Sequence, residues 1–289
     1  MEFEYRLCGN YIYITGYSEN EQICMVPDNI DGKAVGGIDK FAFSEHRELR
    51  EIFLPETVER IGAHAFYNCR ALKTIHMSDG IVDIGDGAFK NCYELAAIDI
   101  KRKGIDSKCL KGILSEVNNE VEVALHYDDG EARLIFPYYL YNYEENTPAR
   151  IINQVTEGSG IRYRECITGE DVNYAEYDRI FGDAMHIDVL DASWKIACLR
   201  LKYPYRLADK AQNQYRKYLE DNRLELTMQM IEQEKYDSLK DFLSMKLLNN
   251  DDLGNCIDMA RGNSQMEGLG ILLEYRKEEY GTRKKKFEF

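Results

Sequence analysis

Apolar residues in the first third of the chain return at the same seven positions of a 23-residue period. The first copy holds Val35, Ile38, Ala42, Phe43, Leu49, Ile52 and Leu54. The second copy holds Val58, Ile61, Ala65, Phe66, Leu72, Ile75 and Met77, and the third holds Ile81, Ile84, Ala88, Phe89, Leu95, Ile98 and Ile100. A fixed period of this length indicates a solenoid, in which each coil covers the apolar face of the next.

The spacing inside one period predicts a short strand. Residues 72–77 fit the pattern L-x-x-L-x-L, so Ile75 and Met77 are expected to point inward and Thr74 and His76 outward. A turn, a second extended piece at 81–84 and a compact segment at 85–92 complete the coil. We therefore expect the phenylalanines of the compact segments to stack as a buried ladder, namely Phe43, Phe66 and Phe89.

Two stretches of the repeat carry a family resemblance. "IGAHAFYNCRALKTI" and "IGDGAFKNCYELAAI" resemble the BspA-like (Treponema-type) leucine-rich repeat, and "VPDNIDGKAVGGIDKFAF" resembles the opening of such arrays. The resemblance covers residues 1–110. It implies a right-handed, parallel-stranded solenoid used for binding, and it implies no catalytic residues, because the motif consists of core positions.

Both ends of so short a stack need a cap. At the front, residues 3–7 and 11–14 flank Gly9-Asn10 and predict a hairpin. At the back, residues 121–125 and 132–136 flank Asp128-Asp129-Gly130 and predict a second hairpin, preceded by a short helix at 107–117.

Helical spacing replaces the 23-residue period from about Pro137. The predicted helices are 149–156, 171–185, 189–202, 207–221, 223–233, 237–248, 253–261 and 266–280. Capping boxes are predicted at two helix starts, Thr168 with Asp171 and Ser264 with Glu267.

The segment "CIDMARGNSQMEGLGILLEY" resembles one ankyrin helix-turn-helix, and "YDSLKDFLSMKLL", 30 residues upstream, looks like the second helix of a degenerate copy. The usual T-P-L-H is missing, and an irregular helical bundle fits almost as well. The predicted fold class is thus α+β, a short leucine-rich repeat β-solenoid at 1–136 followed by a helical domain at 137–289, with ankyrin-like helix pairs near 235–280.

The net charge of −14 argues against a nucleic-acid partner, because an acidic chain repels phosphate backbones. No apolar run approaches the 18 residues that a membrane-spanning helix needs. The N-terminus is Glu-rich rather than signal-peptide-like, which favours the cytoplasm; a cell-surface or secreted location is the alternative if a leader segment has been removed. The eight cysteines are scattered, without C-x-x-C, and favour free buried thiols.

The sequence holds no motif for nucleotide binding, metal-dependent hydrolysis or nucleophilic catalysis, and none for a cofactor. The five histidines are isolated, without metal-ligand spacing. Asp79, Asp83 and Asp86 are interpreted as solvated turn carboxylates rather than calcium ligands.

What remains is the outward face of the strand array. We expect a protein partner there, at Met25, Glu51, Phe53, Thr74, His76 and Asp99. An apolar rank bordered by charges has the layout of a recognition patch, although aromatic residues also occur on strands because they fit a pleated surface. The favoured function is a non-enzymatic interaction or scaffold protein. The alternative is an enzyme or small-ligand-binding domain at 137–230, which a pocket of carboxylates around His186 would favour.

Overall fold

The computed structural model describes residues 3–104, 108–146, 151–168, 171–184 and 190–281. Its contacts group the chain into two compact units, residues 1–208 and 209–289. This division does not coincide with the boundary expected at 136/137, because residues 160–165 and 190–202 contact residues 130–136 at the end of the solenoid.

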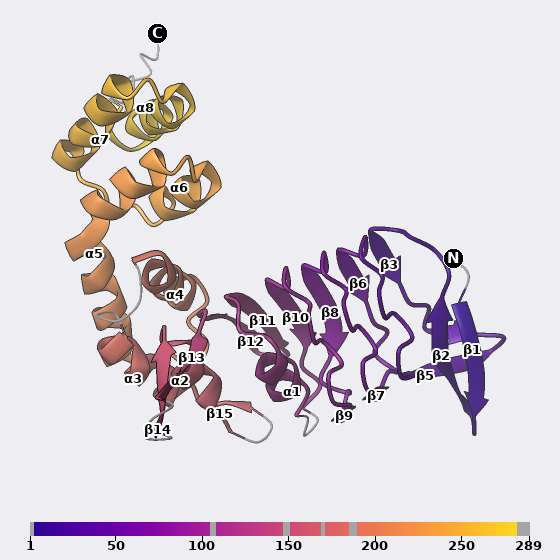
Figure 1. Cartoon of the computed structure of the whole chain (residues 1–289). Helices are drawn as coiled ribbons and strands as arrows, with labels where there is room; N and C mark the ends of the chain where they lie inside the picture. Colours follow the sequence, from indigo (N-terminus) through magenta and orange to yellow (C-terminus); the bar gives the residue numbers. More distant parts are fainter. Residues whose placement is uncertain (1–2, 105–107, 147–150, 169–170, 185–189, 282–289) are drawn as a thin grey trace, which may run out of the picture. The chain divides into compact units, whose positions relative to one another are not determined.

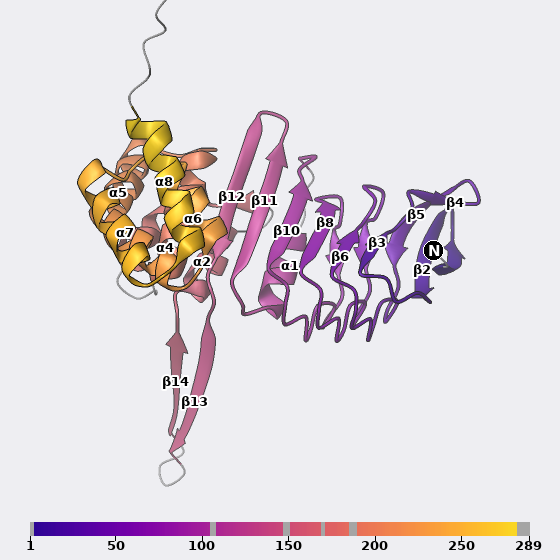
Figure 2. The ribbon, with the colours of Figure 1, turned by 90° about the horizontal axis from the view of Figure 1, so that it is seen from above.

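The first unit is built around a sheet of one strand per coil, in the order β12-β11-β10-β8-β6-β3 (Figures 1 and 2). The parallel strands are β3 (Ile23–Met25), β6 (Glu51–Phe53), β8 (Thr74–Ser78), β10 (Ala97–Lys101) and β11 (Val121–Tyr127). Strand β12 (Gly130–Phe136) turns back antiparallel to β11. The solenoid, its rear hairpin and the α+β class are thereby confirmed.

A second sheet runs along another side of the coils in the order β1-β2-β5-β7-β9, with β4 paired to β5. Its strands are β1 (Phe3–Cys8), β2 (Tyr11–Tyr17), β4 (Asn29–Ile30), β5 (Lys33–Ile38), β7 (Arg60–Ile61) and β9 (Asp83–Ile84). Antiparallel β1 and β2 form the predicted front hairpin.

The predicted phenylalanine ladder lies in the core of the solenoid. Phe43 and Phe66 stack with ring centroids 5.1 Å apart, and Phe66 and Phe89 repeat the same spacing. All three are fully buried. Tyr17 extends the ladder at the front, 5.5 Å from Phe43, so the front hairpin covers the end of the aromatic column.

Each compact segment also contains two left-handed backbone positions. One recurs at Phe41, His64 and Gly87, and the other at Glu45, Asn68 and Asn91, all with φ between 58° and 68°. Asparagine and glycine tolerate this region better than most residues. Asn91 donates to the Oδ1 of Asn68 at 2.8 Å, so side chains link successive coils here.

The buried cysteines of the coils are free thiols that donate hydrogen bonds to backbone carbonyls of the preceding coil. Cys69 donates to the carbonyl of Phe43 at 3.0 Å, and Cys92 donates to that of Phe66 at 3.2 Å. Asp79, by contrast, is not a solvated turn residue. It is fully buried, accepts from the Lys103 amide at 2.8 Å and pairs with Arg102, because the chain folds over it after β10.

Helix α1 (Cys109–Glu116) ends the stack of coils. In earlier coils the amides of His64 and Phe66 donate to carbonyls of the following coil. The equivalent amides of Gly87 and Phe89 instead donate to the two carboxylate oxygens of Glu116, both at 2.6 Å. One side chain thus replaces the backbone of the next coil.

Three helices close the exposed edge of β12: α2 (Gly160–Glu165), α3 (Tyr174–Ala184) and α4 (Leu190–Lys202). The Tyr177 hydroxyl accepts from the Ile135 amide at 3.0 Å and donates to its carbonyl at 2.7 Å. Arg164 donates to four carbonyls, among them that of Leu114 in α1 and that of Pro137 after β12. The Tyr177 bonds satisfy backbone groups of β12 that an open sheet edge would leave available for aggregation.

Two predictions for residues 137–173 are wrong. Residues 151–156, predicted as helix, belong to strand β14 (Ile151–Glu157), which pairs with β13 (Leu140–Asn146). Their β-branched residues suit a strand better. Thr168 and Asp171 form no capping box, because they pair across β15 (Ile167–Thr168) and β16 (Asp171–Val172). Helix α3 begins later, where the Oδ1 of Asn173 accepts from the Glu176 amide at 3.1 Å.

The second unit contains four described helices: α5 (Asp209–Glu232), α6 (Tyr236–Leu243), α7 (Asn250–Gly262) and α8 (Met266–Tyr280). Helix α5 is continuous where two helices were predicted, since no Gly or Pro interrupts it. The capping box at Ser264 is also wrong, because Ser264 has φ 59° and lies in the turn before α8.

The 30-residue spacing in this unit is present in the structure. The turn before α6 and the turn before α8 share a left-handed residue, Glu234 at φ 55° and Ser264 at φ 59°. The next amides, of Lys235 and Gln265, each donate five residues back at 2.9 Å. The turns that join α5 to α6 and α7 to α8 therefore share one backbone conformation.

Candidate functional site

The six predicted partner-binding residues lie together on the outward side of adjacent strands. Met25, Phe53, His76 and Asp99 are paired in register across β3, β6, β8 and β10, and Glu51 and Thr74 occupy the row two residues earlier. Between the two rows lie buried Cys24, Ile52, Ile75 and Ile98. We call the outward side of these four strands the strand face.

The apolar side chains of the strand face are most accessible at its front end. Ile23 is 51% exposed and Met25 is 57% exposed. Phe53 is half-buried because its ring stacks on the imidazole of His76, with centroids 4.1 Å apart and planes 1° apart. The central aromatic residue is therefore held in one orientation by its neighbour on the next strand.

Charged groups border this apolar rank and are paired with one another. His76 places Nε2 2.8 Å from Glu51 Oε1 and Nδ1 4.0 Å from Asp99 Oδ2. His126 of β11 lies with Nε2 3.1 Å from the same Asp99 oxygen. Two hydrogen-bonded pairs, His76 with Glu51 and His126 with Asp99, thus lie side by side on the face, with His76 and Asp99 4.0 Å apart.

Sequence reasoning missed His126. Strands β8 and β10 are offset by 23 residues, but β10 and β11 pair Ala97 with Glu122 and Lys101 with His126, an offset of 25. Adding 23 to the number of a residue in β10 therefore does not give its partner in β11, and the pairing of Lys101 with His126 could not be predicted. Only the hairpin turn at 128–130 marks where β11 ends.

The helices of the first unit lie at the far end of the strand face. Arg133 of β12 stacks over Tyr203 at 4.7 Å and pairs with Glu131 at 2.7 Å and with Glu122 at 3.4 Å. Lys195 of α4 pairs with Glu120 at 2.6 Å. Ile23 and Met25, at the opposite end, keep more than half of their surface exposed.

The alternative of a small-ligand domain at 137–230 rests on a pocket there. A cavity of about 270 Å³ is lined by Arg162, Glu165, Glu176, Arg179 and Ile180. Arg179 pairs with Glu176 at 2.6 Å, and this bond lowers the pKa of the Glu176 carboxyl. A carboxylate held in its ionised form by a guanidinium is a poor proton acceptor. His186 lies outside the described residues.

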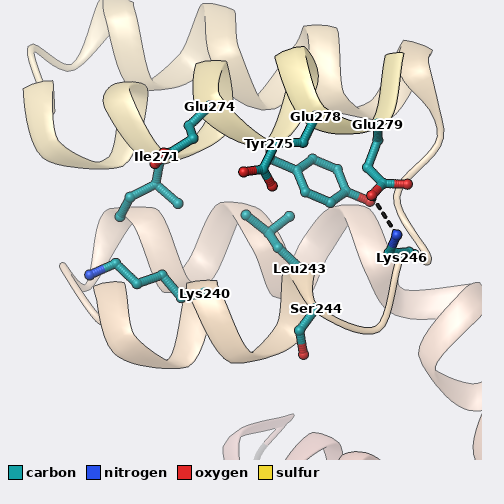
Figure 3. A pocket seen from close by; sticks show the side chains of 9 residues that line it. All are labelled: Lys240, Leu243, Ser244, Lys246, Ile271, Glu274, Tyr275, Glu278 and Glu279. Atoms are coloured by element: carbon teal, nitrogen blue, oxygen red, sulfur yellow. Dashed lines mark ion pairs between the residues drawn. The ribbon is translucent and has the colours of Figure 1, made fainter. Parts of the chain in front are cut away.

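A larger groove of about 370 Å³ lies between α6 and α8 (Figure 3). Leu243, Ile271 and Tyr275 form its floor, and the ion pair of Lys246 with Glu279 at 2.6 Å stands at its rim. Among the described residues, no group of three or more His, Cys, Asp or Glu side chains could hold a metal ion. None of the described helices has the length and apolar character for crossing a membrane.

The chain was compared with known protein families, curated proteins and solved structures. Residues 33–119 match the family "BspA type Leucine rich repeat region". No curated protein matches the chain. The ankyrin resemblance of residues 235–280 is not confirmed by these comparisons and stays a prediction.

Similar solved structures are leucine-rich repeat proteins. A leucine rich cell surface protein from Faecalibacterium prausnitzii is 26% identical over 40% of this chain and 34% of its own, with a TM-score of 0.32. This chain therefore spans about a third of that protein. A leucine-rich repeat protein from Bacteroides capillosus is 24% identical over 34% of this chain and 77% of its own, with a TM-score of 0.32.

A leucine rich repeat protein from T. pallidum is 22% identical over 40% of this chain and 77% of its own, with a TM-score of 0.26. The 23-residue coils, the strand register and the family match agree over the same part of the chain. Residues 33–119 are a leucine-rich repeat region of the BspA type.

Proposed function

We propose that the protein is a non-enzymatic interaction or scaffold protein that binds a protein partner through the strand face. The family match supports a protein-interaction domain. The choice of the strand face as the binding site rests on one observation. Met25, Phe53, His76 and Asp99 are paired in register on adjacent strands, and Met25, at the front of this row, is exposed.

The strand face suits recognition for two physical reasons. Backbone pairing fixes its side chains before binding, and the Phe53–His76 stack removes further rotamer freedom, so little entropy is lost on association. Ile23, Met25 and Phe53 offer an apolar centre, and the paired charges of Glu51, His76 and Asp99 form a polar rim. A partner with an apolar anchor and a polar border fits this layout.

Capture of a partner from native cell extract tests the proposal. Met25→Asp and Phe53→Asp should each abolish capture, because a carboxylate in the apolar centre loses its hydration without gaining a partner. Val82→Asp is the matched control, since Val82 is 49% exposed and lies outside the strand face.

The thermal midpoint of each variant separates binding from folding. Met25→Asp should leave the midpoint nearly unchanged, because more than half of this side chain is already exposed. Phe53→Asp removes the stack on His76 and should lower the midpoint slightly. If Met25→Asp and Phe53→Asp capture the same partner as the unaltered chain does, the strand face is not the binding site.

A further inference from the structure

The strands of the strand face bond one another by a pattern that recurs from coil to coil. Residues whose side chains point outward use their backbone to bond the preceding strand. The Phe53 carbonyl accepts from the Val26 amide at 3.0 Å, and the His76 carbonyl accepts from the Leu54 amide at 2.9 Å. The outward residues of the first strand, β3, should therefore bond a preceding strand in the same way.

No described strand lies in front of β3, which is the last strand of its sheet (Figure 1). Gln22 and Val26 bond the backbone of the following coil. Because backbone groups alternate in direction along a strand, those of Ile23 and Met25 point the other way. No described residue bonds the Ile23 amide or the Met25 carbonyl. This front edge is open, whereas α3 covers the rear edge at β12.

The second sheet continues past this open edge. Strand β5 belongs to the same coil as β3, and β2 and β1 follow beyond β5. Tyr5 pairs with Ile14 and Leu7 pairs with Ile12, so Tyr5 and Leu7 face the same side as two fully buried residues. Yet Tyr5 is 41% exposed and Leu7 is 57% exposed. The inner side of β1 thus carries apolar side chains at a place where the first sheet has no strand.

We infer that an extended segment of a partner protein adds to β3 as one further strand. It takes the place that the strand of a preceding coil would have, and its backbone bonds the Ile23 amide and the Met25 carbonyl. Every second side chain of the segment is apolar and packs on Tyr5 and Leu7, and the others continue the strand face. The inference rests on the proposed function for its choice of a protein partner, and it names the kind of segment that is bound.

A second copy of β3 does not fit this place. Its inward side chains, Cys24 and Val26, are buried in their own coil and cannot pack on the inner side of β1. With three residues, β3 is also short, and short edge strands resist pairing with one another. Glu21 and Asp28 are exposed on either side of β3, so a segment with basic residues at its ends complements the border of the site.

A synthetic peptide of residues 70–78, RALKTIHMS, serves as the probe, because it holds strand β8, alternating apolar residues and two basic residues. The full chain is labelled with carbon-13 at its methionine methyl groups and observed by NMR. Peptide up to about 1 mM, the level of a weak complex, should shift the Met25 signal saturably. The signal of Met266, 73% exposed in the second unit, should stay in place. A peptide carrying Ile75→Asp should shift neither signal, because its carboxylate would lie on the inner side of β1.

Two variants of the chain separate edge pairing from other contacts. Ile23→Pro removes an amide that the fold does not use and should abolish the shift, with a nearly unchanged thermal midpoint, whereas Ile23→Val should bind as the unaltered chain does. Leu7→Asp should also abolish the shift, and it keeps the test decisive if the proline variant does not fold.

Three results overturn the inference. They are a Met25 signal that does not move, a shift that persists in both Ile23→Pro and Leu7→Asp, and association of the chain with itself through β3 in the absence of peptide. The peptide is measured without the native partner. A negative result therefore refutes pairing at this edge and leaves the capture test of the strand face, with Phe53→Asp, to decide the proposed function.

Discussion

At the scale of single residues, the solenoid depends on side chains that repeat the same contact in every coil. In the Phe43–Phe66–Phe89 column each ring stacks on its counterpart one coil away. The Cys69 and Cys92 thiols each donate to the phenylalanine carbonyl of the preceding coil. The middle member of such a column has neighbours on both sides. Its loss should therefore cost more than that of an exposed residue in the same coil.

Phe66→Ala should lower the free energy of unfolding by about 3–5 kcal/mol, the usual cost of truncating a buried aromatic residue. Lys73→Ala is the control in the same coil, because the Lys73 side chain is exposed and its ammonium pairs with Glu94 at 3.8 Å. Urea unfolding of both variants measures the difference. Equal losses would mean that Phe66 is not packed as described.

Burial raises the pKa of the Cys69 thiol to about 12, so the folded chain keeps this proton where the unfolded chain loses it. The free energy of unfolding should thus be insensitive to this group below about pH 8 and should fall between about pH 9 and pH 12. Cys69→Ser, which does not ionise there, should show a shallower fall in urea unfolding against pH. Parallel curves would contradict the prediction.

At the scale of elements, the sequence predicted those that a repeat or a turn motif marks and missed those that neither marks. The strands, both hairpin caps and α1 follow from the period and from turn residues. Strands β13 and β14 were missed because no period-2 alternation marks them, and the local preference of "IINQVT" for strand was outweighed by the expectation of a helical domain.

The same limit applies to the candidate site. Met25, Phe53, His76 and Asp99 were placed in one row because three strands keep the 23-residue offset and β3 lies upstream in the same alternation. His126 was missed, because β11 pairs with β10 at an offset of 25, which places His126 beside Lys101 and 3.1 Å from Asp99. Where the number of residues between paired positions changes from one strand pair to the next, the sequence period cannot predict which side chains meet, and the structure is needed.

Helix α1 leads to a prediction about stability, because its residue Glu116 accepts hydrogen bonds from the last coil. Glu116→Ala leaves the amides of Gly87 and Phe89 without their carboxylate acceptors, and should lower the free energy of unfolding by about 2–4 kcal/mol. Glu116→Gln keeps one carbonyl acceptor and should lose less. Urea unfolding ranks the variants. An alanine variant as stable as the glutamine variant would show that Glu116 does not close the stack.

At the scale of the whole molecule, the division at 208/209 leads to a prediction about fragments. A fragment of residues 1–208 keeps Tyr177 on the Ile135 backbone and should be soluble and monomeric. A fragment of residues 1–136 ends at the β12 edge without this cover and should aggregate. Light scattering of the two purified fragments decides between them. A soluble, folded 1–136 fragment would favour the boundary expected from the sequence.

The uniform coil has a consequence for how such a chain changes over generations. A duplication of 23 codons adds one coil with both left-handed positions, its phenylalanine and one further rank of outward side chains, and it disturbs no neighbour. A gain of 22 or 24 codons would instead reverse which side chains face inward in the strand that follows. Recombination among the copies can therefore lengthen the recognition surface in whole ranks, while its two closing ends, the front hairpin and Glu116, are kept.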